Sequence, residues 1–445
     1  MKKRYFYLII IVISIFVAGF VVLKYSKHDH QDVKFYALLD RTDTLSRPEE
    51  WNQVKQKFDE MMKISATNPD DLPSRIGLAA LYIQEARVTG NHDYYDKAAM
   101  RYVNEVLEKD PVHFEALTYK SLILLSQHQF SEGLAVAEKA REANPYNAFV
   151  HGILVDANVE LGNYERAVAE ADKMVSIRPD MRSYARISYL REIHGDYPGA
   201  IEAMKMAADA GLPGDEATEW TRVQLGHLYE KIGDAANAER TYLYSLELRP
   251  GYAYAIAGLG KIQAMKKKYS AAIEYYLKAD SLIDDHGIKE QLADVYQLND
   301  QVQKANELNK LLIGDMSGAA NGDHHGHGHH AGLELAYIYL KVKDNDEALE
   351  HALEEYHRRP DNIDVNEAVA WVYYCKGEAR KALPFMETAL RTKSNNPILL
   401  RRAGLIYATV GEKAKAKSLL TRTMNNNTCL DLPLQTQCMA AMKNL

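Results

Sequence analysis

The sequence predicts an all-α solenoid of about ten helix-turn-helix repeats, with one N-terminal transmembrane helix. Two sets of residues that recur at a fixed period indicate the repeats. Four prolines stand 34 residues apart, at Pro111, Pro145, Pro179 and Pro213. Small residues recur, in most steps after 33 or 34 residues, at Gly133, Ala167, Ala200, Ala238, Ala272, Ala305, Ala348, Ala382 and Ala416. A fixed period of about 20 to 50 residues is typical of a repeat array.

The composition favours a repetitive architecture and argues against one class of partner. The chain has 445 residues, of which 47% are apolar and 26% charged, and its net charge is −7. This apolar content suffices for a core, but the length is too great for one compact domain unless the architecture repeats. Because binding to nucleic acid requires a basic face, the acidic balance predicts no nucleic-acid partner.

One unit, Thr221–Gly251, shows how the period divides into two helices. Its apolar residues follow helical spacing in two stripes, made of Val223, Leu225, Leu228, Tyr229 and Ile232, and of Ala238, Tyr242, Leu246 and Leu248. Gly233 separates the stripes, because glycine tolerates the left-handed conformation at a helix C-terminus, and Pro250 ends the second. Neither helix can bury its apolar face alone, so the units must stack.

Five units share one pattern of apolar, small and aromatic residues. The matching positions are Leu225, Gly226, Tyr229, Ala238, Tyr242 and Pro250; Leu78, Ala79, Tyr82 and Pro111; Leu335, Ala336, Tyr339, Ala348 and Pro360; Val369, Ala370, Tyr373, Ala382 and Ala389; and Gly404, Tyr407 and Ala416. This pattern resembles that of the tetratricopeptide repeat family, although the family's Trp is absent from every unit. The resemblance covers residues 71–424 and implies a right-handed superhelix, with seven repeats in 71–313 and three in 333–424.

The N-terminal residues 1–24 predict a membrane anchor or a signal sequence. Three basic residues precede the run Tyr5–Leu23, which contains no charge. Nineteen helical residues span about 28 Å, close to the hydrocarbon thickness of a bilayer. The apolar run continues past a possible cleavage site at Ala18, which favours an uncleaved anchor. We therefore expect a membrane-anchored solenoid outside the cytoplasm, periplasmic or on the cell surface; secretion after signal cleavage is the alternative.

Two segments are expected to close the ends of the solenoid. Residues 25–70 form a polar spacer and an N-terminal capping half-repeat, in which Glu49–Ser65 places Trp51, Val54 and Phe58 at helical spacing. Residues 425–445 contain a short amphipathic stretch, Leu432–Met442, that suits a C-terminal capping helix.

Two insertions interrupt the period, and one of them carries a candidate metal site. The first lies around Val88–Asp93, and the second is the His/Gly-rich loop at residues 314–332. The loop holds five histidines, His324, His325, His327, His329 and His330. Imidazole is a common ligand of Zn, Ni and Cu, and the glycines would let several rings converge. The alternative is a solvated loop without a physiological ligand, because nothing in the sequence fixes the orientation of the rings.

The remaining residues give little sign of catalysis. Cys375 is expected to be a buried thiol on a first helix, and Cys429 and Cys438 could form a disulfide if the chain is exported. No nucleophile elbow, phosphate-binding loop or zinc-protease motif stands in a suitable context. The sequence therefore predicts a protein that is not an enzyme and requires no cofactor.

The resemblance implies a concave groove lined by the first helix of each repeat. Carried over by register, this groove includes Tyr189, Glu192, His227, Glu230, Tyr254, Lys261, Asp294, Gln297, Tyr337, Trp371 and Tyr374. Aromatic residues with scattered charges are typical of a surface that binds a protein or peptide, although packing between repeats would use the same positions.

Three functions are compatible with this sequence. The first is a membrane-tethered scaffold that binds a protein or peptide in the groove, as the resemblance implies. The second is a protein that binds, buffers or delivers Zn, Ni or Cu through the histidine loop. The third, a regulatory subunit of an envelope enzyme, cannot be separated from the first by sequence.

Overall fold

The computed structural model describes residues 36–41, 47–321, 331–423 and 432–445. The chain divides into two compact units, residues 1–40 and Arg41–Leu445. In the first unit only residues 36–40 are described, and they have no regular secondary structure. The following account concerns Arg41–Leu445.

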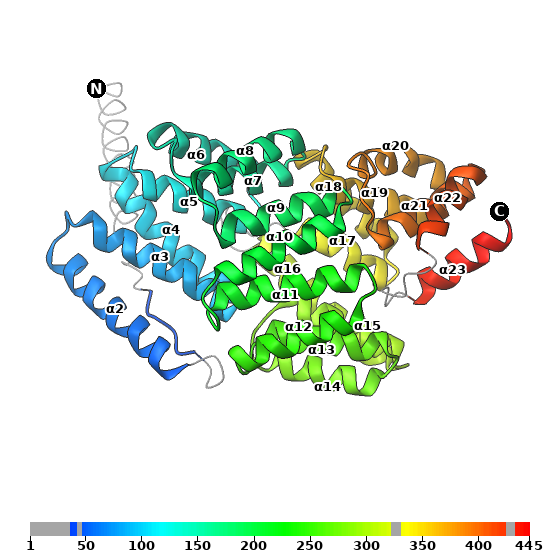
Figure 1. Ribbon diagram of the computed structural model, residues 1–445, viewed down its shortest axis with the longest axis horizontal. Helices are drawn as coiled ribbons and strands as arrows, with labels where there is room; N and C mark the ends of the chain where they lie inside the picture. Colours follow the sequence, from blue (N-terminus) through cyan, green and yellow to red (C-terminus); the bar gives the residue numbers. More distant parts are fainter. Residues whose placement is uncertain (1–35, 42–46, 322–330, 424–431) are drawn as a thin grey trace, which may run out of the picture. The chain divides into compact units, whose positions relative to one another are not determined.

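All regular secondary structure in the described part of this unit is helical (Figure 1). The helices are α2 (Pro48–Thr67), α3 (Leu72–Thr89), α4 (His92–Lys109), α5 (Phe114–Ser126), α6 (Phe130–Ala143), α7 (Ala148–Glu160), α8 (Tyr164–Ile177), α9 (Met181–Ile193), α10 (Tyr197–Ala210), α11 (Glu216–Lys231), α12 (Ala235–Leu248), α13 (Ala253–Met265), α14 (Tyr269–Asp280), α15 (His286–Leu298), α16 (Val302–Asn321), α17 (Gly332–Lys341), α18 (Asn345–Arg358), α19 (Ile363–Cys375), α20 (Ala379–Ala389), α21 (Pro397–Thr409), α22 (Lys413–Thr423) and α23 (Leu432–Lys443). The predicted all-α solenoid is confirmed.

From α3 to α22 each odd-numbered helix packs on the even-numbered helix that follows it. The recurring small residues lie near the start of the second helix, where the two helices cross, and every alanine among them is at most 1% exposed. On the first helix of one pair, Gly226 shows the same need for a small residue: a Cβ atom there would lie 2.3 Å from the Tyr242 ring. A larger residue would therefore separate α11 from α12.

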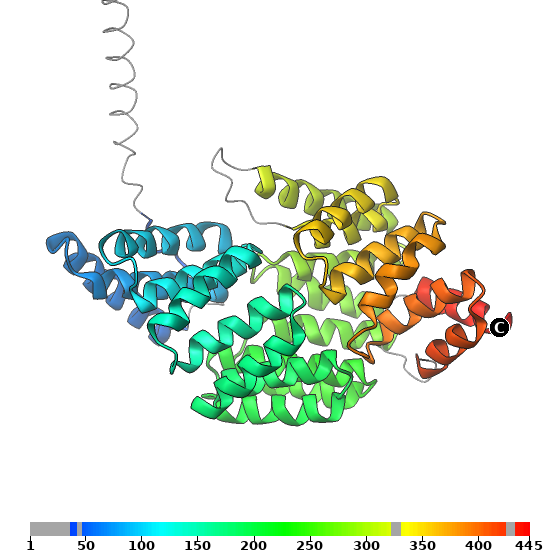
Figure 2. The same ribbon diagram turned by 90° about the horizontal axis from the view of Figure 1, so that it is seen from above.

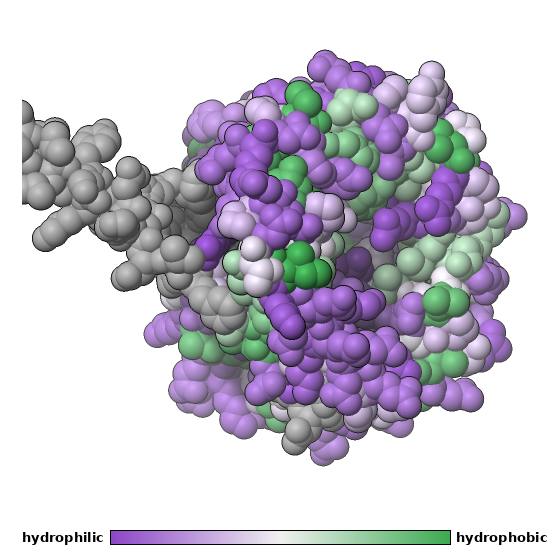
Figure 3. All heavy atoms as spheres, turned by 90° about the vertical axis from the view of Figure 1, so that its left-hand side faces the viewer, coloured by the Kyte–Doolittle hydropathy of each residue, from purple (hydrophilic) through white to green (hydrophobic). Residues whose placement is uncertain are grey.

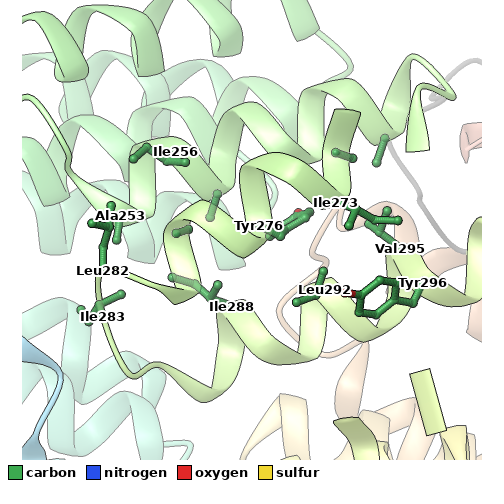
Figure 4. Close-up of a cluster of buried hydrophobic side chains, with 14 of the residues drawn as sticks. Ala253, Ile256, Ile273, Tyr276, Leu282, Ile283, Ile288, Leu292, Val295 and Tyr296 are labelled. Atoms are coloured by element: carbon green, nitrogen blue, oxygen red, sulfur yellow. The ribbon is translucent and has the colours of Figure 1, made fainter. Parts of the chain in front are cut away.

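The pairs are joined to one another by continuous apolar clusters. In one of them, Ile256 of α13, Tyr276 of α14 and Leu292 of α15 are all at most 3% exposed (Figure 4). Because these side chains come from two successive repeats, the core belongs to the stack rather than to any single helix pair.

A single helix lies at each end of the solenoid, α2 and α23. On α2, Trp51, Val54 and Phe58 are each 7% exposed. On α23, Leu434 and Cys438 pack with Leu405 and Leu420. These helices bury the apolar faces that the terminal repeats would otherwise expose to water.

The insertions lengthen helices instead of forming only loops. α3 and α4 have 18 residues each, so the extra residues of the first unit extend both helices. α16 has 20 residues and runs to Asn321, so residues 314–321 of the predicted loop are helical. All five histidines of the candidate metal site, in 324–330, lie outside the described residues.

The superhelix completes one turn in about 200 residues and then contacts itself. Arg249 bonds with Glu50, Arg359 with Glu160, and Ile363 with Tyr164, each across 199 residues. This offset corresponds to about six repeats of about 34 residues. α7 to α9 therefore lie beside the segment from α18 to α20 (Figures 1 and 2). We call this contact between the α7–α10 and α18–α20 segments the seam.

The predicted membrane-anchored location outside the cytoplasm must be corrected. Across 36–41, 47–321, 331–423 and 432–445, no helix is both long and apolar enough to cross a bilayer. The physical reason is visible in α2, which has 20 residues but exposes Lys55, Asp59 and Lys63 on its solvent face. The expected span, Tyr5–Leu23, lies outside the described residues.

Candidate functional site: the inner face of the superhelix

The first helices of the pairs form the inner face of the superhelix. Successive first helices contact one another, as α5 does with α7, α7 with α9, α11 with α13, and α17 with α19. Such contacts are expected on the more strongly curved side of a solenoid. Figure 3 shows an outer face that is largely hydrophilic, with hydrophobic side chains in small separate groups and a hollow near its middle.

The predicted groove residues lie on these first helices. Tyr189 and Glu192 belong to α9, His227 and Glu230 to α11, Tyr254 and Lys261 to α13, Asp294 and Gln297 to α15, Tyr337 to α17, and Trp371 and Tyr374 to α19. Glu230 is buried, whereas the others keep some accessible surface. A ligand can therefore contact only the part of each side chain that neighbouring repeats leave exposed.

Most charged residues of the inner face are paired between successive repeats. The pairs are Asp156 with Arg186, Glu192 with Lys231, Glu230 with Lys261, Glu290 and Asp294 with Lys341, and Glu367 with Arg402. Each joins one first helix to the next, so these charges hold the repeats in register. The side chains predicted for ligand binding thus serve packing as well.

Arg402 connects three of the aromatic and charged residues at the C-terminal part of this face. Its guanidinium lies 2.8 Å from Glu367, donates to the Tyr337 hydroxyl at 3.0 Å, and stands 5.2 Å from the centre of the Trp371 ring. Trp371 in turn stacks on Tyr374, with ring centres 4.9 Å apart. The result is a stacked aromatic pair with a partly buried cation beside it.

His227 is neutral at physiological pH. Burial lowers its pKa to about 4, against the opposing effect of the Glu230 carboxylate. Its ring meets the edge of Tyr242, whose hydroxyl donates to Glu230 at 2.7 Å. The residue therefore acts as a polar packing element, which sequence alone could not distinguish from a ligand contact.

A cavity of about 160 Å³ opens on the inner face where the two turns of the superhelix meet. It is lined by Tyr189, Glu192, Ile193, Lys231, Ile363, Asp364, Glu367, Ala389, Ser394, Asn396 and Leu399. Only Tyr189 and Glu192 were predicted site residues. Asp364 and Glu367 were missed, because their position opposite α9 depends on a contact 200 residues away. Their spacing on one face of α19 was the only sequence signal.

Burial has a common effect on the acids near this cavity. It raises the pKa values of Asp364 and Glu367 and brings that of Glu160 to about 7. Asp364 is still accessible to solvent, but protein surrounds it closely enough to weaken the hydration of its charge. Burial therefore disfavours the charged forms of these three acids.

Two expectations about other side chains have different outcomes. Cys375 is exposed, not buried, because it is the last residue of α19 and lies beyond the packed part of the helix. The possible disulfide is untested, since Cys429 lies outside the described residues. In the described part of the chain, no group of three or more His, Cys, Asp and Glu residues could hold a metal ion.

The fold places the chain in the class of solenoids built from helix pairs. Comparison with known proteins gives a more specific result. A family model described as tetratricopeptide repeat matches residues 85–148, 120–182 and 223–285. These segments of the chain are therefore tetratricopeptide repeats, as the sequence motif indicated. Such arrays are protein-interaction scaffolds and are generally not catalytic. The curated proteins compared with this chain include no match.

Several solved structures match parts of this chain at low identity. The Cut9–Hcn1 heterotetramer of APC/C has a chain 15% identical, with a TM-score of 0.47, matched over 73% of this chain and 60% of its own. Human IFIT1, solved as a dimer with m7Gppp-AAAA, is 15% identical over 78% of this chain and 86% of its own, with a TM-score of 0.42. PilW, a type IV pilus biogenesis factor, is 16% identical over 46% and 94%, with a TM-score of 0.38. This chain therefore spans less than two thirds of the first of these proteins.

Proposed function

We propose that the chain is a non-enzymatic scaffold that binds an extended segment of a protein partner along its inner face. The observation that carries this proposal is the accessible aromatic surface on the first helices. Tyr189 is 38% exposed, and Trp371 and Tyr374 are partly exposed although they also pack against the cluster that includes Leu434 of α23. Aromatic residues of this kind are the usual anchors of protein interfaces.

The geometry favours an extended segment over a folded domain. The seam closes one side of the superhelix, and the cavity beside it has a volume of about 160 Å³. That volume corresponds to roughly five water molecules at about 30 Å³ each, which is room for one side chain. A strand-like peptide can place single side chains in such spaces while its backbone follows the inner face.

Selection from a displayed library of linear dodecapeptides on the full-length chain tests this proposal. We expect enriched peptides whose binding weakens about tenfold or more when Trp371 is replaced by Ala, since aromatic anchors carry most of the binding energy. The matched control is Tyr146→Ala, because Tyr146 is 78% exposed and lies outside the inner face. Failure to enrich any peptide, or equal losses in both variants, would refute the proposal.

Transition-metal binding by the five histidines is a second candidate, carried by their spacing in the sequence. Calorimetric titration of Zn, Ni and Cu into the full-length chain tests it, with all five histidines changed to Ala as the control. Sub-micromolar binding of about one ion that disappears in the control would support a metal site. Weak binding, or binding that the control retains, would remove this candidate.

A further inference from the structure

One carboxylate of the inner face has no counter-cation. Asp364 lies in the first turn of α19 and lines the cavity between the two turns of the superhelix. Among the described residues, no Lys, Arg or His comes within ion-pair distance of its side chain, and its printed hydrogen bond is made by its backbone N–H. Every other acid that lines the cavity has a basic partner.

The nearest cations are engaged elsewhere. Arg359 bonds with Glu355 at 2.8 Å and with Glu160 at 2.5 Å. Lys231 pairs with Glu192, and Arg402 pairs with Glu367. Arg359 and Lys231 still attract Asp364 at longer range, but moving either onto Asp364 would leave another enclosed carboxylate unpaired. Among the described residues, Asp364 therefore has no cation of its own to pair with.

Two features bear on the charge and the accessibility of Asp364. The N-terminus of α19 favours negative charge in its first turn, because the helix dipole is positive there. The side chain also remains open to solvent through the cavity. A ligand can consequently reach this carboxylate, and a hydrogen bond from a cation to a carboxylate is stronger than one between neutral groups.

The walls of the cavity suit an aliphatic stem that ends in a positive charge. Tyr189, Ile193 and Leu399 provide aromatic and apolar surface, and the carboxylates of Glu192 and Glu367 lie near Asp364. Lysine and arginine side chains combine such a stem with a charged end. The cavity is smaller than the roughly 300 Å³ or more that is typical of sites for drug-sized molecules.

We propose that this cavity binds the ammonium or guanidinium group of a basic side chain of the partner, with Asp364 as its counter-ion. The proposal deepens the scaffold function and rests on it, since it specifies a basic residue in the extended segment. It requires both turns of the superhelix, because α9 and α11 supply one wall and α19 to α21 the other. A protein with a Lys or Arg in an extended, accessible segment is thus the class of partner expected.

The first test uses small cations and does not depend on a partner. n-Butylammonium and n-butylguanidinium are added to the full-length chain at low ionic strength, with NaCl at equal ionic strength as reference. We expect either cation to raise Tm above the reference, since a ligand of the folded state stabilises it. The rise should vanish in Asp364→Asn and persist in Asp172→Asn, which removes an equal charge from the exposed side of α8.

The second test uses the selected dodecapeptides. Replacing one Lys or Arg of a bound peptide by norleucine should weaken its binding to the native chain about tenfold, and to Asp364→Asn less than about twofold. Peptides that bind without needing a basic residue would overturn this inference and leave the scaffold function standing. Cations that raise Tm through Asp364 while no peptide is enriched would refute the scaffold instead. A rise in Tm that survives in Asp364→Asn would overturn the site.

Discussion

Two sets of turns in this solenoid have the same backbone but different surroundings. Gly162 and Gly195 lie in the turns after α7 and α9, with φ of 79° and 80°. Gly377 and Gly411 lie in the turns after α19 and α21, with φ of 79° and 90°. A Cβ atom on Gly162 would lie 2.2 Å from the carbonyl oxygen of Asp361, whereas one on Gly377 would meet nothing within 4 Å.

This comparison distinguishes two reasons for the presence of glycine in these turns. All four glycines adopt a left-handed conformation that ends the first helix of a repeat, which is a local requirement. Only Gly162 and Gly195 must also admit the backbone of the next superhelical turn. At the seam, the next superhelical turn therefore approaches a position where the repeat already requires glycine. The following predictions test whether the seam contributes stability that the open turns lack.

The largest effect is expected at Arg359, which is 4% exposed and links the two turns. It bonds with Glu355 and Glu160 and lies 4.6 Å from the centre of the Phe130 ring. We expect Arg359→Met to reduce the free energy of unfolding by about 3 kcal/mol, because it removes a cation from the buried Glu355 and breaks the link to Glu160. Urea denaturation measures this. Arg380→Met, at an exposed position of α20, should change stability by less than about 0.5 kcal/mol.

The next effect compares the two kinds of turn directly. Gly162→Ala and Gly377→Ala each place Ala in the left-handed region, at a cost of about 1 kcal/mol. Gly162→Ala should cost about 2 kcal/mol more, because its methyl group overlaps the Asp361 carbonyl. Thermal unfolding and small-angle scattering measure stability and radius of gyration. An expanded Gly377→Ala, or equal losses in both variants, would contradict a role for the seam.

A pair of tyrosines gives a smaller and finer test. Tyr164 and Tyr197 begin α8 and α10 and are 3% and 6% exposed. The Tyr164 hydroxyl accepts the Ile363 N–H at 2.9 Å across the seam, while no described group bonds the Tyr197 hydroxyl. We expect Tyr164→Phe to cost about 1 kcal/mol and Tyr197→Phe to cost nothing or to stabilise. The urea midpoints of the two variants measure this difference. Equal shifts would contradict a stabilising hydrogen bond across the seam.

The smallest effect is a dependence on pH at Glu160. Burial, with help from Asp364 and Asp156, raises its pKa to about 7 despite Arg359. The folded state then binds more protons than the unfolded state between about pH 4.5 and 7, so stability falls as pH rises through that range. Glu160→Gln should therefore equal the native chain near pH 5 and exceed it at pH 8.

Hydrogen exchange in α7 and α19 measures the Glu160 effect locally. We expect a modest gain, because the side chain keeps 37% of its surface exposed and solvent screens its charge. Glu387→Gln on the exposed side of α20 is the control. A gain that is constant between pH 5 and 8 would show that titration of Glu160 is not the cause.

Local sequence patterns were sufficient to predict the helices and turns of a repeat. The alternation of helix stripes with glycine in Thr221–Gly251 predicted α11, α12 and the turn at Gly233, because helical spacing and left-handed turns are properties of neighbouring residues. The terminal helices α2 and α23 were also predicted. The insertions were harder: the extra residues near Val88 extended α3 and α4, since helix length is set by packing as much as by turn residues.

The candidate site was only partly predictable. The register of the repeat located Tyr189, Trp371 and Tyr374 on the inner face, but it could not show that Glu230 and Lys261 pair with each other. Asp364 was not predicted, although it lines the cavity. Its surroundings come from α9 and α11, which lie about 130 or more residues earlier in the chain, roughly four repeats at about 34 residues each.

The sequence by itself determined the repeat, the helix pairs and the small residues at their crossings, because each depends on contacts within about 40 residues. Only the tertiary structure decided that the superhelix returns on itself after 199 residues. The pitch of a solenoid is the sum of small rotations between repeats, so slight differences in packing accumulate over six of them. The seam, the cavity and the unpaired Asp364 all follow from that sum.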